Sequence, residues 1–288
     1  MNVWKHRLLL RNSIALLLFG VFCFVMLRWF EHSQVYHPAR EFEASAEELG
    51  RPFEDVRFNT ADGVALHGWF FPADTNSPRA NQAFLICHGN GGNISHRLDL
   101  CGVLLKTGAS VLIFDYHGYG QSQGSPGEEG TYLDAQAAYA WLRQKGFRAG
   151  NLVAFGESLG GGVASELALR EDLGGVVLQS TFTSIPDIGA ELYPWLPLRW
   201  ISTIKYDTRS KLPRVKVPVL VMHSREDDFV RFHHAEKNFA AANEPKFFCE
   251  LNGAHNDAVW GSHAFSEAIE KFLRVVDQVA GKTRPNSR

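Results

Sequence analysis

Beyond about residue 50, short apolar runs alternate along the chain with longer segments in which apolar residues recur at helical spacing. Residues 56–59 and 64–70 alternate between apolar and polar side chains on either side of Asp62-Gly63, which predicts a β-hairpin. The runs that follow are continuous and rich in Val, Ile, Leu and Phe, a pattern typical of parallel strands buried on both faces. These runs span residues 83–87, 110–114, 152–155, 175–178, 217–222 and 246–251.

Helical segments are predicted between these strands, at residues 93–106, 130–145, 159–170, 231–242 and 262–278. Strands that alternate with helices form βαβ units, in which the helices cover both faces of a mostly parallel sheet. We therefore expect an α/β fold with about eight strands, in which the hairpin supplies an antiparallel edge. This domain is expected to span residues 51–280 and to be followed by a polar tail at residues 281–288.

The region from residue 182 to residue 215 interrupts this alternation with four prolines. Prolines at this density prevent one long helix, so we expect short helices or turns that form a small cap inserted after a strand. Aromatic residues lie between the prolines, and they either pack onto the domain or line a substrate pocket. These aromatic residues are Tyr193, Trp195, Trp200 and Tyr206.

The N-terminal segment has a different pattern, because residues 13–27 are apolar on all sides of a helix. A bilayer span takes about 20 residues, a length that this run reaches when Arg11 and Arg28 extend their side chains toward the head groups. The segment lacks the small residues of a signal-peptide cleavage site, and an amphipathic surface helix would be apolar on one face only. We predict an uncleaved signal anchor at residues 1–30, followed by a linker at residues 31–50.

The charges that flank this anchor predict its orientation. Lys5, Arg7 and Arg11 lie at its N-terminal side, where no acidic residue is present. Basic flanks are retained on the cytoplasmic side of a membrane. We therefore expect a single-pass membrane protein whose folded domain lies on the non-cytoplasmic side.

The overall composition excludes other classes of function. The 29 basic and 31 acidic residues give a net charge of −2, without the basic cluster that binding to nucleic acid requires. The cysteines form no CxxC pattern and the 12 histidines show no metal-ligand spacing, so we expect neither a metal nor another cofactor. The sequence determines neither the oligomeric state nor whether Cys87, Cys101 and Cys249 are free or paired.

Candidate chemistry begins with the sequence Gly156-Glu157-Ser158-Leu159-Gly160, which matches the G-x-S-x-G motif. It lies between a predicted strand and a predicted helix, the context in which this motif holds a nucleophilic serine on a sharp turn. The flanking glycines keep side chains away from the hydroxyl group. The alternative interpretation is a glycine-rich turn without chemistry. We expect Ser158 to be the nucleophile.

A serine hydroxyl needs a base, and the base needs a carboxylate that orients it. His255 follows the last predicted strand, at the edge where sites form in open α/β sheets. Glu226, Asp227 and Asp228 follow the strand at residues 217–222. On position alone we favour Asp227 for the carboxylate, with Asp228 as the alternative.

The developing oxyanion of acyl transfer needs hydrogen-bond donors, and one of them is expected to be the backbone N–H of Leu159, which follows the nucleophile. A second donor is expected from the glycine-rich loop at residues 87–93, which comes after a strand. A loop of this kind can instead bind phosphate. However, it lacks both the G-x-G-x-x-G pattern and the Lys-Ser/Thr pair of phosphate-binding loops.

Residues 50–280 resemble the α/β-hydrolase superfamily and, within it, the Bem46-like serine hydrolases. The motifs that carry this resemblance are His-Gly-Asn-Gly-Gly-Asn at 88–93, Phe-Asp-Tyr-His-Gly-Tyr-Gly-Gln-Ser at 114–122, Gly-Glu-Ser-Leu-Gly-Gly at 156–161, the acid loop at 223–230 and Gly-Ala-His at 253–255. In the family's acid loop the aspartate stands three residues before a valine. The resemblance therefore favours Asp227 over Asp228, supports His255 and implies that Asn90 supplies the other oxyanion donor.

The residues and the resemblance together predict a serine hydrolase that cleaves an ester-type acyl bond through an acyl-enzyme. A small or lipid-like carboxylic ester is the expected substrate, because an aromatic insertion beside an anchored site suits acyl chains. An acyl-protein thioesterase and a serine peptidase are alternatives within the same chemistry. A non-catalytic binding protein with the same fold is the alternative from another class.

Overall fold

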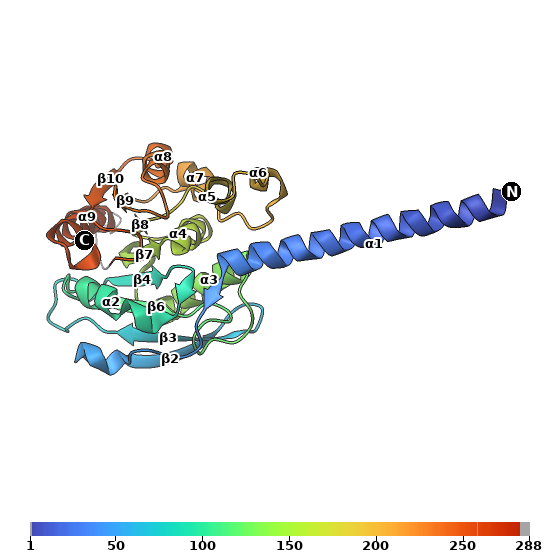
Figure 1. The fold of residues 1–288 in the computed structure, drawn as a ribbon. Coiled ribbons are helices and arrows are strands. Elements are labelled where there is room, and N and C mark those ends of the chain that lie inside the picture. The colour runs from blue at the N-terminus through green and yellow to red at the C-terminus, as the bar shows by residue number, and fades with distance from the viewer. Residues whose placement is uncertain (1, 258, 283–288) are drawn as a thin grey trace.

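The computed structural model describes residues 2–257 and 259–282, and its central element is an eight-stranded sheet of order β10-β9-β8-β7-β4-β6-β3-β2 (Figure 1). Strands β4 and β6 to β10 in this sheet are parallel, whereas β3 runs antiparallel to both β6 and β2. The strands are β2 (Glu54–Asn59), β3 (Ala65–Phe71), β4 (Ala83–Cys87), β6 (Ser110–Phe114), β7 (Leu152–Glu157), β8 (Gly175–Gln179), β9 (Val219–Ser224) and β10 (Lys246–Leu251). The predicted fold class is confirmed, including the antiparallel edge.

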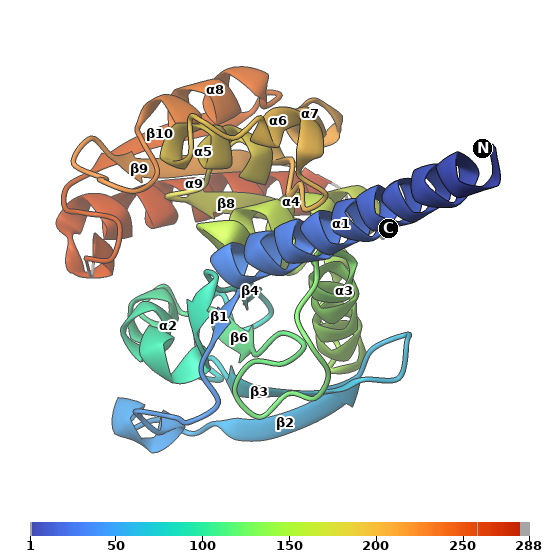
Figure 2. The same ribbon diagram turned by 45° about the vertical axis from the view of Figure 1, so that its right-hand side comes forward.

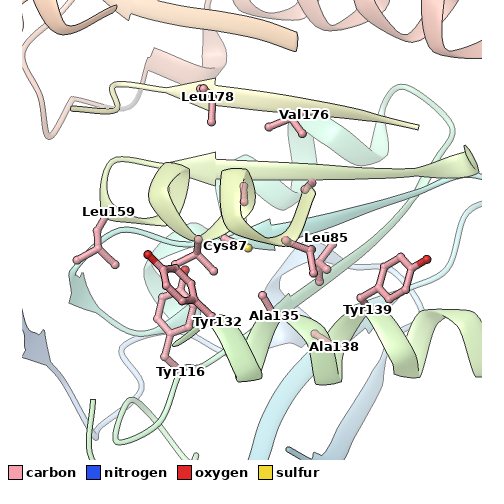
Figure 3. Packing of buried hydrophobic residues seen from close by; sticks show 14 of the residues in the cluster. Leu85, Cys87, Tyr116, Tyr132, Ala135, Ala138, Tyr139, Leu159, Val176 and Leu178 are labelled. Carbon is pink, nitrogen blue, oxygen red and sulfur yellow. The ribbon is translucent and has the colours of Figure 1, made fainter. Parts of the chain in front are cut away.

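Helices cover both faces of this sheet, which explains why every residue of β4, β6 and β8 is buried. Helices α2 and α9 pack on one face, and α3, α4 and α8 pack on the other. Successive side chains of a strand point to opposite faces, so Phe84 contacts the first layer and Leu85 the second. Figure 3 shows Leu85 beside Ala135 and Ala138 of α3. The helices are α2 (Leu98–Leu105), α3 (Glu128–Gln144), α4 (Leu159–Arg170), α8 (His233–Ala241) and α9 (His263–Lys282).

The cap insertion consists of short helices, α5 (Ile185–Leu192), α6 (Leu198–Ile201) and α7 (Thr208–Lys211), followed by a 3₁₀ turn, η4 (Leu212–Arg214). Prolines mark these elements, with Pro186 in the first turn of α5, where its missing N–H costs no hydrogen bond. The aromatic residues of the insertion separate into two groups. Tyr206 is fully buried, whereas Trp195 and Trp200 are 73% and 88% exposed.

Helix α1 (Asn2–Val35) projects away from the domain as a single rod (Figures 1 and 2) and continues beyond the expected end of the anchor at residue 30. The segment expected as a linker packs on the domain instead. Strand β1 (His37–Pro38) pairs with β5 (Gly91–Gly92), and a 3₁₀ turn, η1, follows at Ala46–Leu49. Of the expected tail, residues 283–288 lie outside the described residues.

Candidate active site

Ser158 lies at the sharp turn between β7 and α4, with φ of 51° and ψ of −115°. L-amino acids rarely adopt such a positive φ, so the surrounding structure must hold this residue in place. Glycine is required on both sides of the turn. A Cβ at Gly156 would lie 2.5 Å from the Gly160 carbonyl oxygen, and a Cβ at Gly160 would lie 1.9 Å from the carbonyl oxygen of Cys87. The turn therefore depends on close contact between backbones.

The structure brings Ser158, His255 and Asp227 together from three separate loops. Oγ of Ser158 lies 3.1 Å from Nε2 of His255, and Nδ1 of the same ring lies 2.8 Å from Oδ2 of Asp227. Each residue follows a strand of the parallel part of the sheet, namely β7, β9 or β10. The carboxyl ends of neighbouring parallel strands meet at one edge, which explains how residues far apart in sequence converge here.

Asp227 is the buried member of the three carboxylates in its loop, since it is only 6% exposed. Its Oδ1 accepts hydrogen bonds from the backbone N–H groups of Phe229 (3.1 Å) and Val230 (2.7 Å). Burial raises the pKa of this carboxyl, but hydrogen bonds from His223 and His255 outweigh that effect and hold the pKa well below its usual value. Asp227 therefore carries its negative charge at neutral pH, next to the imidazole of His255.

The two neighbouring carboxylates contact the backbone of the histidine loop rather than the imidazole. Oε2 of Glu226 accepts a hydrogen bond from the Gly253 N–H at 2.9 Å, and Oδ1 of Asp228 accepts one from the His255 N–H at 3.3 Å. All three acids of this run thus bind the loop that carries His255, and Asp227 alone among them meets its ring.

Asn90 and Leu159, the two expected oxyanion residues, both line the cavity beside Ser158. Within the described part of the chain, neither of their backbone N–H groups donates a hydrogen bond to another protein group. The carbonyl of Asn90 is held by the Tyr119 hydroxyl (2.7 Å) and the His37 N–H (3.0 Å). The Leu159 N–H belongs to the first residue of α4, where backbone donors lack partners within the helix.

Sequence reasoning missed a partly buried ion pair beside the nucleophile. Arg97 donates to both carboxylate oxygens of Glu157 at 3.0 and 3.2 Å. Burial raises the pKa of Glu157, but the guanidinium outweighs that effect and lowers the pKa overall. A Cβ at Gly89 would lie 3.3 Å from Nη2 of Arg97 and 3.4 Å from Oε1 of Glu157, so the pair supports both the turn and the glycine-rich loop. The acidic side chain beside Ser158 in the motif was its signal.

His223 was also missed as a part of the site. Its Nε2 lies 2.7 Å from the Val230 carbonyl oxygen and 3.3 Å from Oδ2 of Asp227. A histidine at the end of a buried strand is the signal that could have found it. His223 supports the acid loop from inside the domain.

The cavity beside Ser158 is lined mainly by apolar side chains that come from three regions. These regions are the C-terminal end of α1, the cap helices α5 and α6, and the loops around the nucleophile and Asp227. The lining residues are Leu27, Arg28, Phe30, Glu31, Gln34, Val35, Asn90, Ser158, Leu159, Phe182, Ile185, Ile188, Gly189, Leu192, Tyr193, Leu198, Ser202 and Phe229. The aromatic cap residue Tyr193 therefore lines the cavity, while Tyr206 packs in the core.

One cluster in the described part of the chain has residue types that bind metals. The ligand atoms of Glu191, His233 and His234 lie within 4.8 Å of one another, in the cap and at the start of α8. Oε1 of Glu191 lies 2.8 Å from Nε2 of His233, and Arg231 approaches the same carboxylate at 4.0 Å. The Glu191 carboxylate therefore lies between two histidines and a guanidinium group. The cysteines Cys23, Cys87, Cys101 and Cys249 are free thiols.

Sheet order, nucleophile turn and site together define an α/β hydrolase, and comparisons with known proteins agree. Residues 82–203 match the family model described as alpha/beta hydrolase fold. An uncharacterised protein of Mycobacterium tuberculosis is 38% identical over 90% of this chain and 92% of its own length. The WAV2 protein of Arabidopsis thaliana, described as alpha/beta hydrolase domain-containing, is 30% identical over 85% of this chain and 87% of its own.

Protein bem46 of Schizosaccharomyces pombe is 28% identical over 94% of this chain and 93% of its own. Among solved structures, the Pyrococcus furiosus esterase Pf2001 superimposes with a TM-score of 0.69 at 21% identity, covering 83% of this chain and 98% of the esterase. This chain belongs to the α/β-hydrolase family. Its relatives confirm the predicted resemblance to Bem46 proteins.

Helix α1, at the N-terminal side of the hydrolase domain, contains a candidate membrane span. Its stretch His6–Val35 is long and apolar enough to cross a membrane. The apolar side chains of this stretch from Leu8 to Met26 are exposed, which is the expected condition of residues that face lipid.

Proposed function

We propose that this protein is a serine hydrolase that cleaves carboxylic esters with lipid-like acyl chains through an acyl-enzyme intermediate. The observation that carries the proposal is the chain of contacts from Ser158 through His255 to Asp227, at 3.1 and 2.8 Å, beside an apolar cavity. A nucleophile, a base and an orienting carboxylate at hydrogen-bond distance are the parts that acyl transfer requires.

In the acylation half-reaction, Oγ of Ser158 attacks the acyl carbonyl carbon while its proton passes to Nε2 of His255. The tetrahedral intermediate then collapses, the bond from carbon to the alcohol oxygen breaks, and His255 gives its proton to that oxygen. In deacylation, water loses a proton to His255 and attacks the acyl carbon. The bond to Oγ breaks, Ser158 recovers its proton, and the carboxylic acid leaves.

Two groups of contacts support the charges that develop in these steps. The ionised Asp227 stabilises the imidazolium form of His255 and holds its ring in place. The N–H groups of Asn90 and Leu159 are assigned to the oxyanion, where one donor is worth about 3–4 kcal/mol. All of these groups are held by the fold before substrate binds, so little reorganisation is needed during reaction.

We assign helix α1 as an uncleaved membrane anchor, with the catalytic domain on the non-cytoplasmic side. The exposed apolar length of α1 and the basic residues near its N-terminal end support this assignment. Lipid-like esters are favoured over short soluble ones because apolar side chains dominate the cavity. Neither a metal nor another cofactor takes part in the proposed mechanism.

The first experiment is the labelling of full-length protein in membranes with a fluorophosphonate probe, which reacts with activated serines. We expect the wild type to be labelled and Ser158→Ala to be unlabelled. Ser165→Ala, which changes a buried serine on α4, is the matched control and should be labelled like wild type. A folded wild type that is not labelled would favour the non-catalytic binding protein. Labelling of Ser158→Ala would mean that another residue is the nucleophile.

Substrate class is tested next, with protein that has not been exposed to the probe. Rates on 4-nitrophenyl esters of increasing chain length, on acyl thioesters and on aminoacyl amides should rank esters of long acids first. Faster turnover of thioesters or amides would support the acyl-protein thioesterase or the serine peptidase instead.

A further inference from the structure

Helix α1 supplies a wall of the cavity beside Ser158 in addition to its apolar span. Six residues of its last three turns line that cavity, with the spacing of one helix face. These residues are Leu27, Arg28, Phe30, Glu31, Gln34 and Val35. Cap helices α5 and α6 form the opposite wall, so the cavity lies between the cap and α1, the helix proposed to cross the membrane.

Two paired charged residues of this helix, Arg28 and Glu31, attach it to the cap through hydrogen bonds. Oε2 of Glu31 lies 2.7 Å from Nη1 of Arg28, and the Glu31 side chain is only 7% exposed. Glu31 also accepts hydrogen bonds from the backbone N–H groups of Thr203 (2.8 Å) and Ile204 (3.1 Å) and from the hydroxyl of Ser202. A carboxylate that is buried with this many donors is held in one position.

Arg28 and the next turns of the helix add further contacts to the cap. Nη2 of Arg28 donates to the carbonyl oxygen of Ile201 at 2.8 Å. The Tyr193 hydroxyl donates to Oε1 of Gln34 at 2.6 Å, and the Tyr193 ring packs edge-on against Phe30 with ring centres 5.6 Å apart. The interface between residues 27–35 of α1 and the cap, called the seam below, is therefore held by hydrogen bonds and aromatic packing.

Leu27 connects this seam to the membrane. It is the last residue of the apolar run before Arg28, and its side chain lines the cavity. Trp29 on the helix and Trp195 on the cap are 64% and 73% exposed, and Trp195 packs edge-on against Tyr193. Exposed tryptophans are typical of the boundary between lipid and water. Leu27 is thus both the last residue of the apolar run and a lining residue of the cavity.

We infer that the seam between α1 and the cap is the acyl-chain site of this enzyme, and that Leu27 and Phe30 determine which chain lengths are accepted. The acyl chain of a membrane-resident ester would enter along the seam from the bilayer, with its carbonyl directed to Ser158. This inference rests on the proposed serine hydrolase activity. It adds to that activity the assignment of chain-length specificity to a helix that lies outside the sequence motifs of the domain.

The test uses full-length protein in nanodiscs and compares 4-nitrophenyl acetate with 4-nitrophenyl dodecanoate. Leu27→Trp places a larger side chain in the seam. We expect kcat/KM for the dodecanoate to fall at least about tenfold and the value for the acetate to stay within about twofold. Phe30→Ala enlarges the seam and should raise kcat/KM for the dodecanoate relative to the value for the acetate. Val25→Trp adds the same ring to the exposed face of α1 and should change neither substrate.

The outcomes separate this inference from the proposed function. Equal losses on both esters in Leu27→Trp, or no change in Leu27→Trp and Phe30→Ala, would overturn the acyl-chain site while the enzyme remains a hydrolase. A Val25→Trp variant with the same selectivity change would also overturn it, because that residue faces away from the cavity. Absence of hydrolysis and of fluorophosphonate labelling in wild type would reject the proposed function itself.

Discussion

The side-chain amide of Asn90 donates a hydrogen bond to the carbonyl oxygen of Val35 at 3.0 Å. The loop assigned to the oxyanion is thereby attached to the last residue of helix α1. The short pairing of β1 with β5 strengthens this attachment, since the Ala39 N–H binds the Gly92 carbonyl at 3.0 Å. The geometry of the oxyanion loop consequently depends on a segment that lies outside the parallel sheet.

This attachment predicts that Asn90→Ala impairs catalysis although the backbone N–H of residue 90 remains. Loss of one hydrogen bond of about 1 kcal/mol loosens the loop, so we expect kcat to fall several-fold with little change in KM. Steady-state kinetics on a 4-nitrophenyl ester measures both constants. A rise in KM at constant kcat would place Asn90 in substrate binding instead.

The carboxylates of the acid loop should differ sharply in their effect on rate. Asp227→Asn removes the charge that orients and stabilises the His255 ring, and we expect kcat to fall by about 10³–10⁴-fold. Asp228→Asn alters a backbone contact only and should cost less than about tenfold. Kinetics of the two purified variants gives the comparison. Equal losses would contradict the assignment of Asp227.

The nucleophile turn predicts an unusual order of stabilities. Because Ser158 has a positive φ, Ser158→Gly should relieve strain that Ser158→Ala retains. We expect the glycine variant to be more stable than the alanine variant by about 1 kcal/mol, while both are inactive. Thermal unfolding followed by circular dichroism measures the difference. Equal stabilities would show that the turn is unstrained.

The buried histidine in the glycine-rich loop predicts a pH dependence of stability. Burial lowers the pKa of His88 to about 4, from 6.5. Between pH 6.5 and 4 this histidine is protonated in the unfolded chain but neutral in the folded chain. The stability that its neutral form contributes is therefore present above pH 6.5 and is lost as pH falls toward 4, by up to about 3 kcal/mol. His88→Gln cannot titrate and should lose less stability than wild type between pH 7 and 5. Parallel losses in thermal unfolding would contradict this origin.

The ion pair on α1 predicts a local change at the cap. Glu31→Ala leaves the N–H groups of Thr203 and Ile204 without their acceptor, so these amides should exchange hydrogen at least about tenfold faster than in wild type. Glu43→Ala removes an exposed carboxylate and serves as the control. Hydrogen-exchange mass spectrometry resolves the cap peptides. Unchanged exchange in Glu31→Ala would mean that the cap is held by other contacts.

Much of the fold follows from local pattern. The strands at residues 83–87, 110–114 and 246–251 have the predicted bounds, because continuous apolar runs between helices have few alternatives to a buried parallel strand. The helix predicted at residues 93–106 is instead a 3₁₀ turn, η2 (Ile94–Arg97), followed by α2. Asn93 accounts for the turn, since its side chain accepts the Ser95 N–H and caps it.

Local sequence also determined the type and order of the groups proposed for catalysis. A glycine-flanked serine between a strand and a helix, and polar residues after later strands, mark positions that any parallel sheet brings to one edge. Local sequence could not determine that the helix from residue 27 to 35 borders the same cavity. Glu31 of this helix is buried against Ser202, Thr203 and Ile204, and two of its partners are backbone N–H groups, which every residue except proline carries. Only the tertiary structure decides such a contact, because a pattern of side chains does not encode which backbone a buried carboxylate will meet.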